Sequence, residues 1–148
     1  DGSNLEARAR MQLGAAYAGT AIEGSMLGLA HALANPLTAH FGIVHGEAIG
    51  ILLPHVIRFN SENAEVAEIY QGLDSGCLAR RVETMRGVAG LPGGLSRMGV
   101  DPAMIPCLAA EAREQWTASF NPRTPEAGDI EGLYHSALLE DRAARSAP

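Results

Sequence analysis

The sequence predicts an all-α protein, a helical bundle of about six helices formed by residues 1–148. Apolar residues make up 47% of the chain but aromatic residues only 5%, so Ala, Leu, Ile, Val and Met must build most of the interior, a composition that favours packed helices. No segment of useful length alternates apolar and polar residues as a half-buried strand does. A chain of 148 residues is long enough for one domain with a single core.

The first expected helix covers residues 5–34, where strong helix formers follow Asn4, a suitable capping residue. Each glycine in an exposed helix costs about 1 kcal/mol relative to alanine, so a closely packed neighbouring helix should compensate for those found here. This helix is therefore expected in the middle of the bundle. Pro36 should end it, with a loop over residues 35–42. The glycines concerned are Gly14, Gly19, Gly24 and Gly28.

Apolar periodicity and turn residues place the remaining elements. A helix over residues 45–59 contains Pro54, which should kink or split it. Glycines and prolines predict a connecting loop over residues 87–99 and a break over 121–125. The other helices are expected at residues 62–73, 74–89, 102 to 119 or 120, and 126–143.

Composition excludes several functions. Eleven basic against seventeen acidic residues give a net charge of −6, which argues against nucleic-acid binding. The chain contains no lysine, so Schiff-base chemistry is excluded, and no stretch reads as a membrane span. Cys77 and Cys107 are interpreted as reduced thiols in small core positions, which is typical of a cytoplasmic protein.

The candidate metal-binding residues of this chain are found among its histidines. Four of the five lie between His31 and His55, and the loop between the first two helices could direct His31 and His45 toward one point. Imidazoles on two rigid elements can begin a divalent metal site, although two ligands are too few to complete one. Alternatively, both are polar helix-end residues satisfied by backbone groups. His40 is expected in the loop, either lining a site or simply exposed, His55 as a packing residue and His135 at the surface.

Three sequence blocks, followed by Asn60, carry a family resemblance: residues 31–37 (HALANPL), 44–48 (VHGEA) and 52–56 (LLPHV). Together they resemble the C-terminal helical domain of the iron-containing, group III alcohol dehydrogenases. The fourteen-residue separation of His31 and His45 matches the spacing of that family's last two metal-binding histidines. The Asn-Pro-Arg run over residues 121–123 resembles the family's terminal segment.

The resemblance implies a dehydroquinate synthase-like two-domain enzyme, an NAD(P)-dependent dehydrogenase that interconverts a small-molecule alcohol and its aldehyde or ketone. His31 and His45 would bind a divalent metal, with Fe²⁺ expected and Zn²⁺ as the alternative. The other two metal ligands and the nucleotide-binding domain for NAD or NADP are expected to precede Asp1. We therefore expect this chain alone to be inactive, and a homodimer would fit the family.

One position departs from the family. Many members carry a second histidine four residues after the first ligand, where this chain has Asn35. An amide can orient a hydroxyl or carboxamide but cannot shuttle a proton. His40 is the candidate to supply that imidazole instead. Two other interpretations stay open at this point: a maleylacetate reductase-like domain that reduces a keto acid with little or no metal, and a non-catalytic helical interaction module.

Overall fold

The computed structural model describes residues 2–138, which contain helices but no strand. The predicted all-α fold is confirmed, with seven α-helices and three short 3₁₀ helices in the described part. In chain order the elements are α1 (Leu5–Ser25), α2 (Leu29–Phe41), α3 (His45–Asn60), α4 (Ala64–Leu73), α5 (Leu78–Val88), η1 (Leu95–Met98), η2 (Pro102–Met104), α6 (Ile105–Glu114), η3 (Trp116–Phe120) and α7 (Ala127–Leu138).

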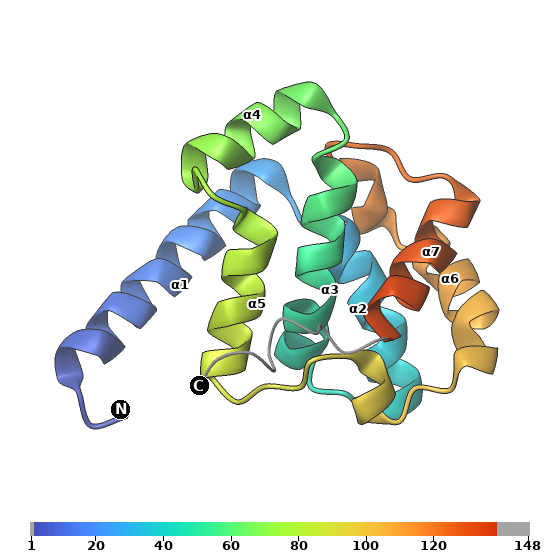
Figure 1. Ribbon diagram of the computed structural model, residues 1–148, viewed down its shortest axis with the longest axis horizontal. Helices are drawn as coiled ribbons and strands as arrows, with labels where there is room; N and C mark the ends of the chain where they lie inside the picture. The colour runs from blue at the N-terminus through green and yellow to red at the C-terminus, as the bar shows by residue number, and fades with distance from the viewer. Residues whose placement is uncertain (1, 139–148) are drawn as a thin grey trace.

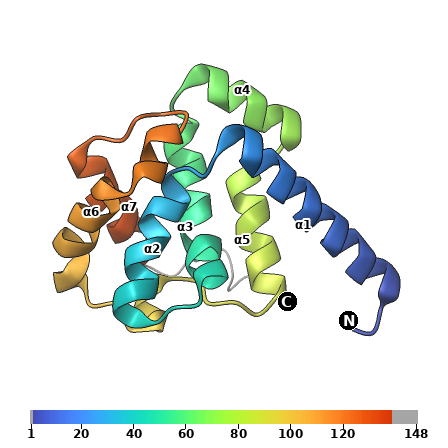
Figure 2. The ribbon, with the colours of Figure 1, turned by 180° about the vertical axis from the view of Figure 1, so that it is seen from behind.

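The helices α2 and α3 form the centre of the molecule and run in opposite directions (Figures 1 and 2). The helix α5 packs on one side of this pair, while α6 and α7 pack together on the other. Fully buried aliphatic side chains fill the space between them and hold the helices by apolar burial. They include Leu29, Leu33, Leu37, Ile51, Leu52, Ile105 and Leu108.

The expected single helix over residues 5–34 is in fact two helices, because the chain breaks between α1 and α2. Met26 has φ 60° and ψ −177°, far from helical values, and is the only non-glycine residue with positive φ in the described part of the chain. Such a conformation costs on the order of 1–3 kcal/mol and persists only where the surroundings enforce it. Here the N–H of Leu29 donates to Oδ1 of Asn121, 3.3 Å away, which fixes the start of α2.

The prediction that the first helix lies in the middle of the bundle is also wrong. Every residue of α1 is exposed, and Figures 1 and 2 show the helix extending away from the others. A Cβ atom at Gly14, Gly19 or Gly24 would meet nothing within 4 Å, so no described helix compensates for these glycines. Large apolar side chains are exposed along α1 as well: Leu5, Met11, Leu13, Tyr17 and Ile22.

Pro36 does not end a helix as expected; it lies inside α2, which continues to Phe41. A proline has no N–H, so the carbonyl of Ala32, four residues before Pro36 in the preceding turn, has no helical donor. The Tyr134 hydroxyl on α7 donates to the carbonyl of Leu33 in that turn, at 2.7 Å. Burial, and secondarily the charge of Glu111, raise the pKa of Tyr134 well above its usual range, so the phenol keeps the proton it donates.

Pro54 lies inside α3, which is not split. Its missing N–H leaves the carbonyl of Gly50, four residues earlier, without a helical donor. The guanidinium of the buried Arg86 on α5 donates to that carbonyl at 3.3 Å. The neighbouring ion pair between Arg58 and the buried Glu83 also ties α3 to α5. A side chain from another helix therefore donates to a carbonyl in the turn before each of the two prolines, and at Pro54 that carbonyl is the one left without a helical donor.

Other predicted elements exist with changed limits. The predicted helices over 62–73 and 74–89 begin later, at Ala64 and Leu78. The expected helix from Pro102 onward is divided into η2, α6 and η3, and the predicted loop over 87–99 contains η1. The final helix begins at Ala127, and its expected continuation to 143 lies outside the described residues. None of the described helices combines the length and the apolar character needed to span a bilayer.

The buried hydrogen bond from Tyr134 to Leu33 predicts a measurable stability loss when the hydroxyl is removed. Tyr134→Phe removes one hydroxyl and leaves the Leu33 carbonyl without this donor in a buried place, so the free energy of unfolding should fall by about 1–3 kcal/mol. Urea denaturation followed by circular dichroism measures it. Tyr17→Phe removes the same hydroxyl from the exposed helix α1 and serves as the matched control. Equal stability of the two variants would show that the hydrogen bond from Tyr134 to Leu33 does not stabilise the fold.

Candidate functional site

His31 and His45 lie beside each other although they are fourteen residues apart. The centroids of their rings are 5.2 Å apart and the ring planes meet at 46°. From His31 to the end of α2 the chain advances about 15 Å along the helix, and the non-helical residues 42–44 then reverse its direction. Gly42 adopts a left-handed conformation with φ 63° and ψ 19°, which turns the chain, and α3 then begins at His45 with its ring beside that of His31. The rings therefore converge, while their role as metal ligands remains a prediction.

The surroundings keep the His31 ring neutral. Burial, and after it the positive charge of a protonated His45 beside it, lower the pKa of His31 below its usual value of 6.5. A metal ion binds the lone pair of a neutral imidazole, so a lowered pKa reduces competition from protons. His31 thus has the protonation state that a metal ligand needs near neutral pH.

The spacing of the two rings also fits one shared ion. A ring nitrogen bound about 2.1 Å from a metal places the ring centroid about 3.2 Å from it, so two such centroids lie about 4.5–5.3 Å apart for ligand angles between 90° and 109°. The observed 5.2 Å falls in this range. Among residues 2–138 no third histidine, cysteine or carboxylate atom gathers with this pair. The described residues therefore offer two ligands of a shell that needs more.

Asn35 lies one turn after His31 on the same face of α2. Its Nδ2 donates to Oε1 of Gln115 at 2.9 Å, immediately before η3. The next residue, Trp116, stacks edge to face with Phe120, with centroids 5.7 Å apart, and both rings are largely exposed. An amide pair and an aromatic surface therefore adjoin the turn of α2 that carries His31.

The structure does not bring His40 to this pair. His40 was expected in a loop but belongs to the last turn of α2, where its Nε2 lies 2.7 Å from Oε1 of Glu111 on α6. The interpretation of Cys77 and Cys107 as buried core residues is wrong, because both are exposed free thiols. His135 is exposed and His55 is partly buried, as expected.

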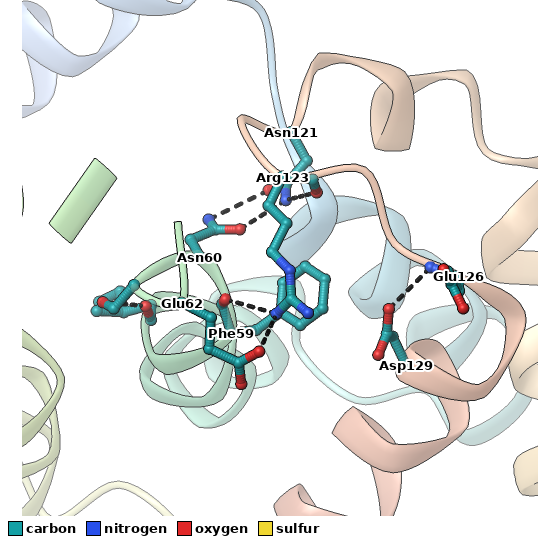
Figure 3. A network of polar contacts seen from close by, with 9 residues as sticks. Phe59, Asn60, Glu62, Asn121, Arg123, Glu126 and Asp129 are labelled. Carbon is teal, nitrogen blue, oxygen red and sulfur yellow. Dashed lines mark hydrogen bonds and ion pairs between the residues drawn. The ribbon is translucent and has the colours of Figure 1, made fainter. Parts of the chain in front are cut away.

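A buried amide pair holds the start of α2 in place (Figure 3). Asn121 Nδ2 donates to Oδ1 of Asn60 at 2.7 Å, and both residues are almost fully buried. Asn121 Oδ1 accepts from the N–H of Leu29, so one amide joins α2, α3 and the segment after η3. A Cβ atom at Gly28 would lie 3.2 Å from that oxygen, so a larger residue there would require the Asn121 amide to shift by a few tenths of an ångström. His31 follows Leu29 by two residues, so this contact determines where its ring lies.

Arg123 closes the same segment onto α3. Its guanidinium donates to the carbonyl of Phe59 at 2.8 Å and lies 3.8 Å from the centroid of that ring (Figure 3). It also pairs with Glu62 at 2.9 Å. Asn121 Nδ2 donates to the carbonyl of Arg123 itself, at 2.7 Å. The Asn-Pro-Arg run over residues 121–123 therefore holds the segment after η3 against the end of α3.

Sequence reasoning did not single out Gln115 or Trp116 and assigned no role to Asn121. The exposed Trp116 is the only tryptophan in the chain, a signal that could have marked this surface. The family resemblance included Asn121 in the Asn-Pro-Arg run but assigned no function to it. Its role depends on contacts with residues 61 and 92 positions away, which local patterns do not show.

The structure thus shows an all-helical domain in which two imidazoles from successive helices lie side by side. The sequence profile of the Fe-containing alcohol dehydrogenase family, C-terminal, matches residues 1–138. The chain belongs to this family.

Individual relatives show which members of this family the chain is similar to. The chain is 33% identical over 145 residues to lactaldehyde reductase of Escherichia coli K12, a match covering 89% of this chain and 38% of that protein. It is 32% identical over 150 residues to 1,3-propanediol dehydrogenase of Citrobacter freundii, covering 93% and 39%. The solved structure of a 1,3-propanediol oxidoreductase superposes with a TM-score of 0.79 at 31% identity, again covering 93% and 39%. The chain thus spans about two fifths of its relatives' length.

The role of Asn121 predicts a large loss on truncation. Asn121→Ala leaves the Asn60 amide and the Leu29 N–H without their buried partner, so the free energy of unfolding should fall by about 2–4 kcal/mol. Chemical denaturation measures this. Asn4→Ala, an asparagine cap on the exposed helix α1, is the control and should cost less. If the two variants were equally stable, the amide pair would not anchor α2.

The neighbouring rings predict a coupled titration in the metal-free chain. His31 should titrate below 6.5, and His45→Ala should raise the pKa of His31 by removing the second imidazolium charge, though not to its usual value because burial is the larger cause. Two-dimensional NMR of the imidazole protons against pH measures both. The exposed His135 is an internal reference. An unchanged His31 titration in the variant would place the rings too far apart to share an ion.

Proposed function

We propose that this chain is the helical, metal-carrying domain of an NAD(P)-dependent alcohol dehydrogenase. The observation that carries the proposal is the His31–His45 pair, whose spacing fits one shared ion in a chain of this family. In the reaction, the alcohol carbon gives a hydride to the nicotinamide and the hydroxyl releases a proton. The carbonyl product is then an aldehyde or ketone, and the reverse reaction reduces it.

His31 and His45 would hold a divalent ion, for which we propose Fe²⁺, with Zn²⁺ as the alternative. When bound, such an ion supplies Lewis-acid stabilisation for the negative charge that develops on the substrate oxygen. The imidazoles are neutral ligands, so they leave the positive charge of the ion undiminished. Burial, and after it the positive charge of a protonated His45, lower the pKa of His31 and so keep its ring neutral.

Asn35 and Gln115 would orient the reactants. Their mutual hydrogen bond fixes both amides one turn from His31, where they can donate to or accept from a hydroxyl or a carboxamide. Neither amide can transfer a proton at neutral pH, so the hydroxyl proton leaves by another path. We assign His40 no part in it, because its Nε2 is engaged with Glu111 on a different face of α2. Trp116 and Phe120 form an apolar wall that would exclude water from the hydride path.

The remaining parts of the enzyme would come from outside this chain. More than half of each named relative lies beyond the matched region, which leaves room for a nucleotide-binding domain and further metal ligands. The resemblance implies that those ligands are an aspartate and a histidine four residues later, on a helix preceding Asp1. The exposed apolar side chains of α1 are the surface we propose for packing against that preceding part. A homodimer is a further expectation of the family.

For the substrate we propose a short alcohol or its aldehyde. The relatives are named for lactaldehyde and 1,3-propanediol, which are both three-carbon compounds. A small substrate is consistent with a site in which an aromatic wall and two amides lie one helical turn from the proposed metal ligands.

The proposal predicts metal loss on removing either imidazole. In the longer protein that contains this chain, His31→Ala or His45→Ala should lower Fe²⁺ affinity by at least about tenfold and alcohol oxidation in parallel. Inductively coupled plasma mass spectrometry measures bound metal, and NAD(P)H absorbance measures turnover. His135→Ala, an exposed histidine on α7, is the control and should retain both. Full metal content and activity in both site variants would refute the assignment.

A further inference from the structure

A second group of metal-binding side chains lies between α2 and α6. His40 comes from the last turn of α2, and Cys107 and Glu111 come from successive turns of α6. One ligand atom from each, a nitrogen, a sulfur and an oxygen, lies within 4.8 Å of the others. Oε1 of Glu111 is 2.7 Å from Nε2 of His40 and 3.7 Å from Sγ of Cys107.

This group is separate from the His31–His45 pair. Nine residues separate His31 from His40 within α2, which corresponds to about 14 Å along the axis and about half a turn of net rotation. His31 therefore contacts His45, while His40 faces α6. An ion held at one place cannot be ligated by the histidine of the other.

The three side chains match the chemistry of a zinc-type ion. Zn²⁺ takes thiolate, imidazole and carboxylate ligands, and three protein ligands leave a fourth position for water. Donor atoms around such an ion lie about 3.3–3.8 Å from one another. The Cys107–Glu111 distance already meets this, and the His40–Glu111 distance needs an increase of at least about half an ångström, which flexible and partly exposed side chains can make. Cys107 and Glu111 are four residues apart, so α6 presents both on one face.

We propose that His40, Cys107 and Glu111 form a binding site for a zinc-type divalent cation that links α2 to α6. The site goes beyond the proposed dehydrogenase function, because it needs no residue outside this chain and none of the residues assigned to hydride transfer. A bound ion would replace the contact between His40 and Glu111, which contributes little to stability where its side chains are this exposed. It would also hold the end of α6 that leads to Gln115, the partner of Asn35.

Cobalt tests this site directly, because Co²⁺ occupies zinc sites and a thiolate ligand adds a charge-transfer absorption in the near ultraviolet. The metal-free full chain should develop this band on titration with Co²⁺. Cys107→Ser should abolish it, whereas Cys77→Ser, which removes the other exposed thiol, should leave it intact. His40→Ala and Glu111→Gln should each weaken the apparent Co²⁺ affinity by at least about tenfold.

Two further measurements distinguish this site from the His31–His45 pair and from nonspecific metal binding. The double variant His31→Ala with His45→Ala should retain the thiolate band, so the failure of one metal site is distinguishable from the failure of the other. Zn²⁺ should slow alkylation of Cys107 but not of Cys77, read by peptide mass spectrometry, and circular dichroism confirms that each variant folds. Absence of the band in the folded chain, its retention in Cys107→Ser, or equal alkylation of both thiols with Zn²⁺ present would overturn the proposal.

Discussion

The hydrogen-bonded pair of Asn60 and Asn121 is the constraint on which the arrangement of the site depends. Two amides buried away from water are costly unless they satisfy one another, and here they do so while Asn121 also accepts the N–H that begins α2. One contact thereby sets the start of α2 against the end of α3. His31 follows at the second residue beyond this anchor, and the reversal of the chain after α2 supplies His45. The aromatic and guanidinium contacts of Arg123 reinforce the same junction.

The overall fold could be predicted from local properties, but its breaks could not. Helix-forming residues and the absence of strand patterns predicted the all-α class, and the helix beginning at His45 was placed within one residue at each end. The break at Met26 has no proline beside it, and the N-cap residue Gly28 has no side chain to cap α2; the capping oxygen belongs to Asn121 instead. Pro36 was expected to end a helix, yet it lies buried inside α2, and Tyr134 on α7, 101 positions from Leu33, donates to the Leu33 carbonyl in the turn before it. Contacts between distant residues, which local propensity does not show, accompany both departures from the prediction.

The candidate site, like the fold, could be predicted only in part from the sequence. The spacing of His31 and His45, together with the neighbouring sequence blocks, predicted the pair that the structure brings together. Gln115 and Trp116 could not be predicted from the sequence, because only the hydrogen bond between Gln115 and Asn35 on α2 places them beside the candidate site. Cys107 was interpreted as a core residue on the general tendency of cysteines to be buried, and only its exposure beside His40 and Glu111 reveals a candidate ligand set. Composition shows which residue types are present, but only the structure shows which of them lie close enough together to form a site.

Joint binding of one ion by His31 and His45 is tested most directly by anomalous X-ray diffraction above and below the iron absorption edge. The crystals should be of the longer protein that we propose contains this chain, prepared with Fe²⁺ in the absence of oxygen. We expect an iron peak about 2.0–2.2 Å from a ring nitrogen of both histidines, with its remaining ligands from sequence outside this chain. An iron peak bound to only one of these rings, or to neither, would contradict joint binding.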